Sequence, residues 1–67
     1  MNMKYENGKW YINDGSIIVA SARRHGSGWI VSGNDENGQP FETWAINETR
    51  AKKLLKKHTG YAPTRTP

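Results

Sequence analysis

The sequence predicts a small α+β domain, in which an antiparallel meander of four or five strands is followed by one C-terminal amphipathic helix packed on one face. Turn-forming dipeptides divide the first two thirds of the chain into short segments rich in aromatic and β-branched residues, a pattern typical of strands joined by hairpins. The segment that follows has apolar residues at helical spacing. The 67 residues allow one domain. We expect it to span residues 1–61, with a disordered tail at residues 62–67, which contain two prolines and no apolar periodicity.

Two dipeptides, Asn7-Gly8 and Asp14-Gly15, are the first predicted hairpin turns. Both favour the type I′ turn, because each of its central residues needs a positive φ. The first turn places Tyr5 opposite Trp10, and the second places Trp10 opposite Val19. The face shared by the two hairpins is then Met3, Tyr5, Trp10, Ile12, Ile17 and Val19. The opposite face is Lys9, Tyr11, Ile18 and Ala20. Because two independent turns give the same face, the pattern indicates a sheet.

Two loops divide the rest of the sheet. The Gly-rich segment His25–Gly28 follows one strand, and the loop Asp35–Gly38 follows the next. Pro40 limits pairing where the last strand begins, because proline has no N–H group to donate. The remaining strands are predicted at about Ser16–Arg23, Trp29–Asn34 and Phe41–Ile46.

One helix is predicted directly after the last strand. Asn47 is a favourable N-cap, and Gly60 is placed to end the helix in the left-handed conformation. We expect the apolar side of this helix to pack on the sheet, on the face that contains Trp10, with Tyr61 folded back against Leu55. The apolar stripe consists of Ala51, Leu54, Leu55 and His58.

The excess positive charge of the chain lies in the predicted helix. The formal net charge is +4, and the segment Glu48–His58 accounts for it, because its five Lys and Arg residues are offset only by Glu48. A localised basic surface suits an acidic partner such as nucleic acid. We expect Lys53, Lys56 and Lys57, on the outer arc of the helix, to attract phosphate without sequence preference.

A second group of cations lies beside aromatic residues in the predicted sheet. Arg23 and Arg24 end one strand close to Trp29 on the next, and Lys9 alternates with Tyr11 on a neighbouring strand. Cations can neutralise phosphates while exposed rings stack on bases. We therefore expect Arg23 and Arg24, with Trp29, to make the specific nucleic-acid contacts. In the alternative interpretation, the tryptophans of the last two strands are core rings and the arginines only keep a sheet edge soluble.

Catalysis, metal binding and membrane insertion have no signal in the sequence. The chain has no Cys, which excludes disulfides and thiolate ligands and favours a reducing compartment. Its histidines, His25 and His58, are too few and too distant for a zinc site, and no motif places a Ser beside a base. The longest apolar run is Ile17–Ala20. We therefore expect no catalytic residue, no metal or other cofactor, no membrane partner and a soluble, cytoplasmic protein.

From Ile17 to His58 the chain has an aromatic strand, a hairpin with the pattern D-x-x-G, a second aromatic strand and an A-x-x-L helix. The residues of this pattern are Trp29 and Val31, Asp35 and Gly38, Phe41 and Trp44, and Ala51 and Leu54. The pattern resembles the N-terminal arm-binding domains of tyrosine recombinases from phage and conjugative transposons, and more loosely AP2-type domains. The resemblance implies a three-stranded sheet that enters the DNA major groove, with contacts from Arg23, Arg24 and the strand that begins at Trp29. The predicted hairpin Met3–Asn13 is additional to the family pattern.

Two functions are compatible with these features. The first is a non-catalytic nucleic-acid-binding module, for DNA more readily than for RNA, that derives from a phage or another mobile element. The second is a small protein-binding inhibitor or adaptor that uses an exposed sheet edge or an aromatic patch. Salt separates the two, because nucleic-acid binding weakens steeply with ionic strength and an aromatic protein interface does not.

Overall fold

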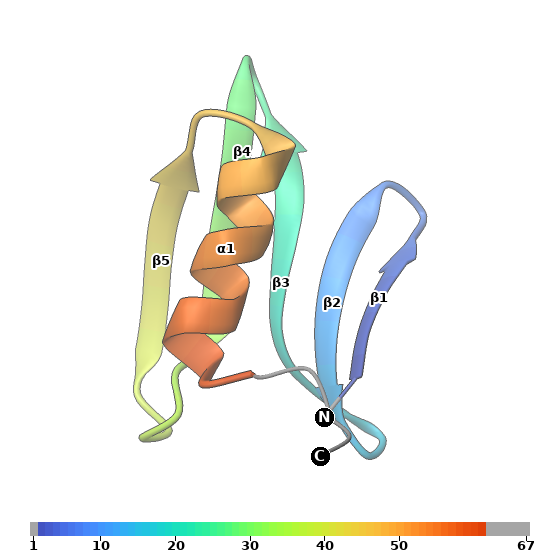
Figure 1. The fold of residues 1–67 in the computed structure, drawn as a ribbon, viewed down its shortest axis with the longest axis vertical. Helices are drawn as coiled ribbons and strands as arrows, with labels where there is room; N and C mark the ends of the chain where they lie inside the picture. The colour runs from blue at the N-terminus through green and yellow to red at the C-terminus, as the bar shows by residue number, and fades with distance from the viewer. Residues whose placement is uncertain (1, 62–67) are drawn as a thin grey trace, which may run out of the picture.

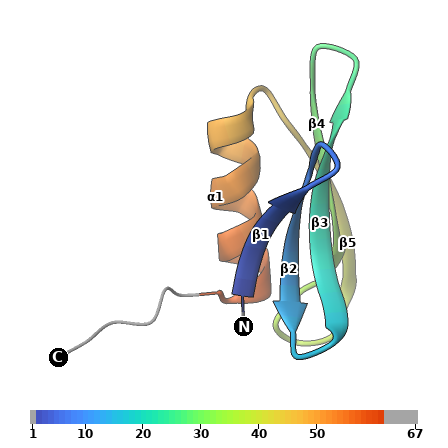
Figure 2. The same ribbon diagram turned by 90° about the vertical axis from the view of Figure 1, so that its right-hand side faces the viewer.

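Five strands and one helix make up residues 2–61, which are the residues that the computed structural model describes. The elements are β1 (Asn2–Glu6), β2 (Lys9–Asp14), β3 (Ile17–His25), β4 (Gly28–Asn34), β5 (Pro40–Ala45) and α1 (Glu48–Thr59). Each strand pairs antiparallel with the next, so the order in the sheet is the order in the chain (Figure 1). α1 lies across one face, and no other described element covers the opposite face (Figure 2). The predicted fold class is confirmed, and the predicted tail at residues 62–67 lies outside the described residues.

The hairpin between β1 and β2 forms as predicted. Its central residues are Asn7 and Gly8, and both have the positive φ that a type I′ turn requires, 53° and 78°. Tyr5 consequently lies opposite Trp10, and the centroids of the two rings are 5.1 Å apart. An aromatic pair across two strands contributes roughly 0.2–1 kcal/mol, which helps to hold an edge strand that has only one neighbour.

The turn between β2 and β3 differs from the prediction by one residue. Asp14 pairs with Ile17, so the central residues are Gly15 and Ser16. Gly15 has a φ of 65°, as the first central position of a type II′ turn requires. The prediction of Asp14 and Gly15 as the central pair is therefore wrong. An Asp-Gly-Ser sequence contains two overlapping two-residue turns, and dipeptide preference alone does not select between them.

A bulge in β3 changes the face on which the following residues lie. The register changes between Ile12 and Asn13, so Val19 has no direct partner and Ala20 lies opposite Ile12. The shifted turn moves the register by two residues, so it leaves each side chain on its predicted face. The one extra residue of the bulge then turns the rest of β3 to the opposite face. Ala20, predicted on the far face, therefore lies on the helix side and is only 2% exposed. Ile17 precedes the bulge, pairs with Asp14 at the end of the hairpin and is 68% exposed. Val19 still packs against the core.

The other two connections lie where the sequence places loops. Gly26 and Ser27 form the tight turn between β3 and β4, and both strands continue up to it. In the loop before β5, the Oδ1 atom of Asp35 accepts hydrogen bonds from the backbone N–H groups of Asn37 and Gln39, both at 2.9 Å. Asp commonly stabilises a turn in this way.

α1 begins and ends at the predicted caps. The Oδ1 atom of Asn47 accepts a hydrogen bond from the Arg50 backbone N–H group at 2.9 Å, and Gly60 has a φ of 71°. The centre of the apolar stripe is Leu55, which is fully buried, whereas Leu54 lies half-buried at the margin. The buried apolar core consists of Ile12, Ala20, Ala22, Trp29, Val31, Ala45, Ala51 and Leu55.

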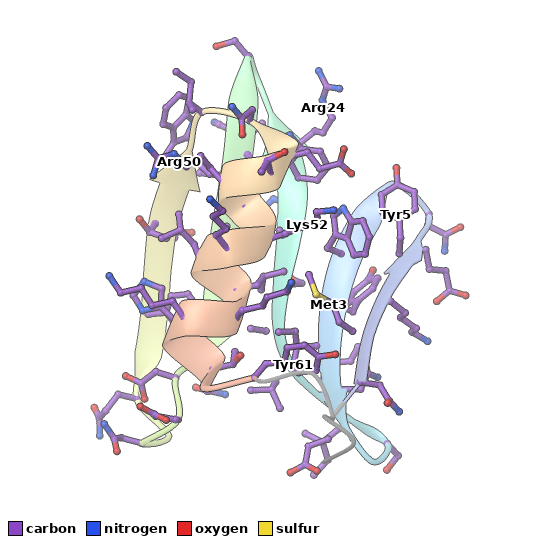
Figure 3. The ribbon with its side chains drawn as sticks, viewed as in Figure 1. Met3, Tyr5, Arg24, Arg50, Lys52 and Tyr61 are labelled. Carbon is purple, nitrogen blue, oxygen red and sulfur yellow. The ribbon has the colours of Figure 1, made fainter. Side chains whose placement is uncertain are left out.

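The helix covers only part of the sheet. It packs over β3, β4 and β5 and reaches β2, but it does not extend over β1 (Figure 1). At the margin, the Nε1 atom of Trp10 donates a hydrogen bond to Oε2 of Glu48 at 2.7 Å. The Nζ atom of Lys52 lies 4.8 Å from the centroid of the same ring, and Figure 3 shows Lys52 directed from α1 toward the β1–β2 hairpin. These two contacts join the helix to β2.

Candidate nucleic-acid interface

The face of the sheet opposite α1, called the open face below, carries two rows of side chains that cross all five strands. Alternation along each strand determines which residues belong to it, because Ile12, Ala22 and Val31 are buried on the helix side. Each member of a row lies directly opposite the next. The first row is Glu6, Lys9, Arg23, Ile30 and Trp44. The second row is Lys4, Tyr11, Ser21, Ser32 and Glu42.

Lys9 and Arg23 form a pair of like charges in the first row. They lie directly opposite each other on β2 and β3, and both are exposed. Glu6 lies opposite Lys9 on β1, but within the described residues the only ion pair joins Glu6 to Lys4 at 3.4 Å. Neither Lys9 nor Arg23 therefore forms an ion pair in that part of the chain. Like charges directly opposite each other destabilise a ladder, and an anion bound between them would relieve the repulsion. The pair can therefore hold a phosphate group.

Two aromatic rings share the open face with this pair. Tyr11 is the next open-face residue after Lys9 on β2, and it is half-buried. Trp44 ends the first row on β5 and is 50% exposed. Arg23 belongs to β3, which lies between the strands that carry the two rings. This arrangement can neutralise a nucleic-acid backbone and stack on bases at the same time.

Arg24 and Trp29 lie on the helix side of the sheet. Trp29 belongs to the core and is 6% exposed, and the Cζ atom of Arg24 is 6.0 Å from the centroid of its ring. The predicted cluster of Arg23, Arg24 and Trp29 is thus divided between two faces, because successive residues of a strand point in opposite directions. Trp29 has the position that the core-ring interpretation expects, whereas Trp44, which that interpretation also assigns to the core, is half exposed.

The cations of α1, apart from Lys52, face away from the sheet. Lys52 is half-buried beside Trp10, and Figure 3 shows it with Arg50 on the helix side of the molecule. The charge excess and the open face therefore lie on opposite sides of the domain (Figure 2). A ligand that lies flat on the open face does not contact these cations directly. The exposed members of this group are Arg50, Lys53, Lys56 and Lys57.

Trp44 is the main residue that the sequence-based prediction of the binding surface omits. Alternation along β5 is the available signal, because it places Trp44 on the face opposite to Phe41 and Ala45. That signal does not say which of the two faces the helix covers. The choice depends on the packing of α1 against β3 and β4, which the strand pattern does not contain.

Comparison with family models, with curated proteins and with solved structures finds no match to this chain. The resemblance to arm-binding and AP2-type domains therefore stays a prediction. Residues 2–61 contain no pocket and no group of three or more His, Cys, Asp or Glu residues that could hold a metal ion. In the same range, no helix has both the length and the apolar character needed to cross a bilayer.

Proposed function

We propose that the chain is a non-catalytic nucleic-acid-binding module and that it binds through the open face of the sheet. The observation that carries the proposal is the Lys9–Arg23 pair, which is exposed, forms no ion pair within residues 2–61 and shares the open face with Tyr11 and Trp44. Arg can bind a phosphate with two parallel hydrogen bonds, and Lys adds a point charge. We expect DNA ahead of RNA, and an origin in a phage or another mobile element, on the resemblance alone.

The cations of α1 have a secondary role in this proposal. They lie on the far side of the domain, so they act on the ligand through the overall field and not through contacts. Screening limits that field to about 8 Å at physiological ionic strength. Their contribution is therefore confined to low salt and does not depend on sequence.

The matched pair Arg23→Gln and Arg24→Gln tests the proposal. The two variants remove the same charge from adjacent positions, but only Arg23 lies on the open face. A lost hydrogen bond to a charged group costs about 1.5–3 kcal/mol, so we expect Arg23→Gln to weaken binding by roughly 10- to 100-fold. It should also lower the slope of log K against log salt by about 1. Arg24→Gln should have a much smaller effect on both quantities.

Titration of labelled mixed-sequence DNA and RNA at two or more salt concentrations measures these changes. Circular dichroism confirms that each variant is folded. Equal losses in the two variants would show that binding depends on net charge and not on the open face. A parent protein that binds no nucleic acid at low salt would exclude the proposal.

The second candidate function is a protein-binding inhibitor or adaptor, and exposed apolar residues favour it. Trp44 is 50% exposed, Ile46 63%, Ile17 68% and Ile18 55%. Exposed groups of large apolar residues often mark protein interfaces. Binding through them would change little with salt and would tolerate Arg23→Gln, so the same titrations against a candidate protein partner separate the two functions.

A further inference from the structure

We infer that the nucleic acid bound on the open face is single-stranded. This inference rests on the proposed function of that face and adds the class of ligand. In this arrangement, Tyr11 and Trp44 each stack on an unpaired base, and Lys9 and Arg23 neutralise the backbone between them.

The width of the sheet is the first support for this inference. Four spacings of about 4.8 Å separate β1 from β5, so the sheet measures about 19 Å across before side chains are added. The major groove of B-DNA is about 12 Å wide and admits one helix or a two-stranded ribbon. Both open-face rows extend without interruption from β1 to β5. The face therefore cannot lie flat in a duplex groove.

The hairpin of β1 and β2 is responsible for this difference in width. Without it, the backbones of β3, β4 and β5 would span about 10 Å, which is less than the width of the groove. β2 also carries Lys9 and Tyr11, so the hairpin widens the surface and supplies two of its binding side chains. The family resemblance implies a three-stranded sheet inserted into the DNA major groove. The sheet of this chain has five strands, so its whole open face does not insert in that way.

The separation of the two rings is the second support. Tyr11 on β2 and Trp44 on β5 are three strand spacings apart, about 14 Å. Successive bases in a duplex strand are about 3.4 Å apart along the axis and are stacked on one another, which leaves no ring face free. The two side chains can stack only on bases that have left such a stack. A single strand offers these without the cost of unpairing.

The small number of free cations is the third support. On the open face, Lys4 is paired with Glu6, and Lys9 and Arg23 remain. A protein that makes about 6–10 phosphate contacts to duplex DNA needs a comparable number of cations or other donors. Stacking of bases on aromatic rings contributes to the affinity for a single strand, and it tolerates any base. Two cations with two rings suit a single strand better than a duplex.

The test compares one oligonucleotide sequence of about twelve nucleotides in three forms: single-stranded DNA, single-stranded RNA and duplex DNA. We expect the parent protein to bind at least one single strand tenfold or more tightly than the duplex. Tyr11→Ala and Trp44→Ala should each weaken single-strand binding by roughly 5- to 100-fold and leave any weak duplex binding unchanged. Ile46→Ala, which removes a more exposed apolar side chain near Trp44 in the chain, is the control and should have little effect.

Trp44→Phe provides a second readout that does not depend on a large loss of stability. It should retain most of the affinity, because phenylalanine also stacks on bases. Binding of a single strand should quench the tryptophan fluorescence of the parent, and this quenching should be much weaker in Trp44→Phe. The remaining quenching reports Trp10 and Trp29, of which Trp29 is buried.

The outcomes distinguish the inference from the function on which it rests. Duplex binding as tight as single-strand binding would overturn the inference and leave nucleic-acid binding in place. Equal losses in Trp44→Ala and Ile46→Ala would also overturn it, because the indole ring would then have no specific role. Failure of the folded parent to bind any of the three oligonucleotides would exclude both.

Discussion

The indole ring of Trp44 lies against the backbone of Gly28 on the neighbouring strand. A Cβ atom at position 28 would lie 2.5 Å from Cε2 of Trp44 and 2.6 Å from the carbonyl oxygen of Ala45. Both distances are shorter than ordinary van der Waals contact. Gly28 therefore provides the space in which the half-exposed ring lies, and it fixes the position of that ring at the end of the open face.

Gly28→Ala should destabilise the domain by about 1–3 kcal/mol, because the added methyl group overpacks a filled site. Urea denaturation measures the free energy of unfolding. In a Trp44→Ala background the same substitution should cost less, since one of the two obstacles has been removed. An unchanged cost in that background would show that the Ala45 carbonyl alone determines the requirement for glycine.

Leu55→Ala should cost about 2–5 kcal/mol, which is a large part of the stability of so small a domain. Leu55 is fully buried against the sheet, whereas Leu54 is half-buried. Leu54→Ala should therefore destabilise the domain by a smaller amount. Thermal melts of the two variants give the comparison, and an equal or greater cost for Leu54→Ala would contradict the packing of α1 described above.

Gly33→Ala should be among the most destabilising small substitutions in the sheet. Gly33 has a φ of 145°, a conformation that residues with a Cβ atom rarely adopt. An added Cβ atom would also lie 2.5 Å from the carbonyl oxygen of Val19, and this backbone atom cannot rotate away. We expect a loss of about 2 kcal/mol or more, measured by chemical denaturation. A loss below about 0.5 kcal/mol would show that the bulge at Val19 adapts easily.

Replacement of Lys53, Lys56 and Lys57 by Gln should leave stability within about 0.5 kcal/mol of the parent, because exposed charges contribute little. The triple variant should bind nucleic acid more weakly at low salt and nearly as well as the parent at physiological salt. Titrations at the two ionic strengths measure this difference. A loss of affinity that persists at physiological salt would indicate direct contacts from α1.

Local signals were sufficient for most of the fold. Asn7 and Gly8 favour one turn type because both tolerate the positive φ that its central positions require. Asn47 and Gly60 define the ends of the helix through their capping preferences. The register of the second hairpin was not predictable in the same way. Its turn is displaced by one residue, and the bulge at Val19 turns the rest of β3 to the other face, but no residue type in β3 identifies a bulge.

The spatial grouping of the predicted site residues followed from the sequence only in part. Arg23 and Arg24 are adjacent in the chain, and alternation alone requires them to point to opposite faces of a strand. Which of them shares a face with Lys9 follows from the register between β2 and β3, and that register includes the bulge. The role of Trp29 depends on the position of α1, since the same ring would be exposed on an uncovered sheet. The register between β2 and β3 and the position of α1 both depend on tertiary packing.

β1 is held by a single neighbouring strand and receives no cover from α1. Parts of a protein with few buried contacts open more often than the core, so β1 amides should exchange with deuterium faster than those of β3 and β4. Mass spectrometry or NMR can measure this gradient of protection. The same edge strand completes both open-face rows. The open face therefore has its full width only while β1 is paired with β2, and it is narrower whenever β1 detaches.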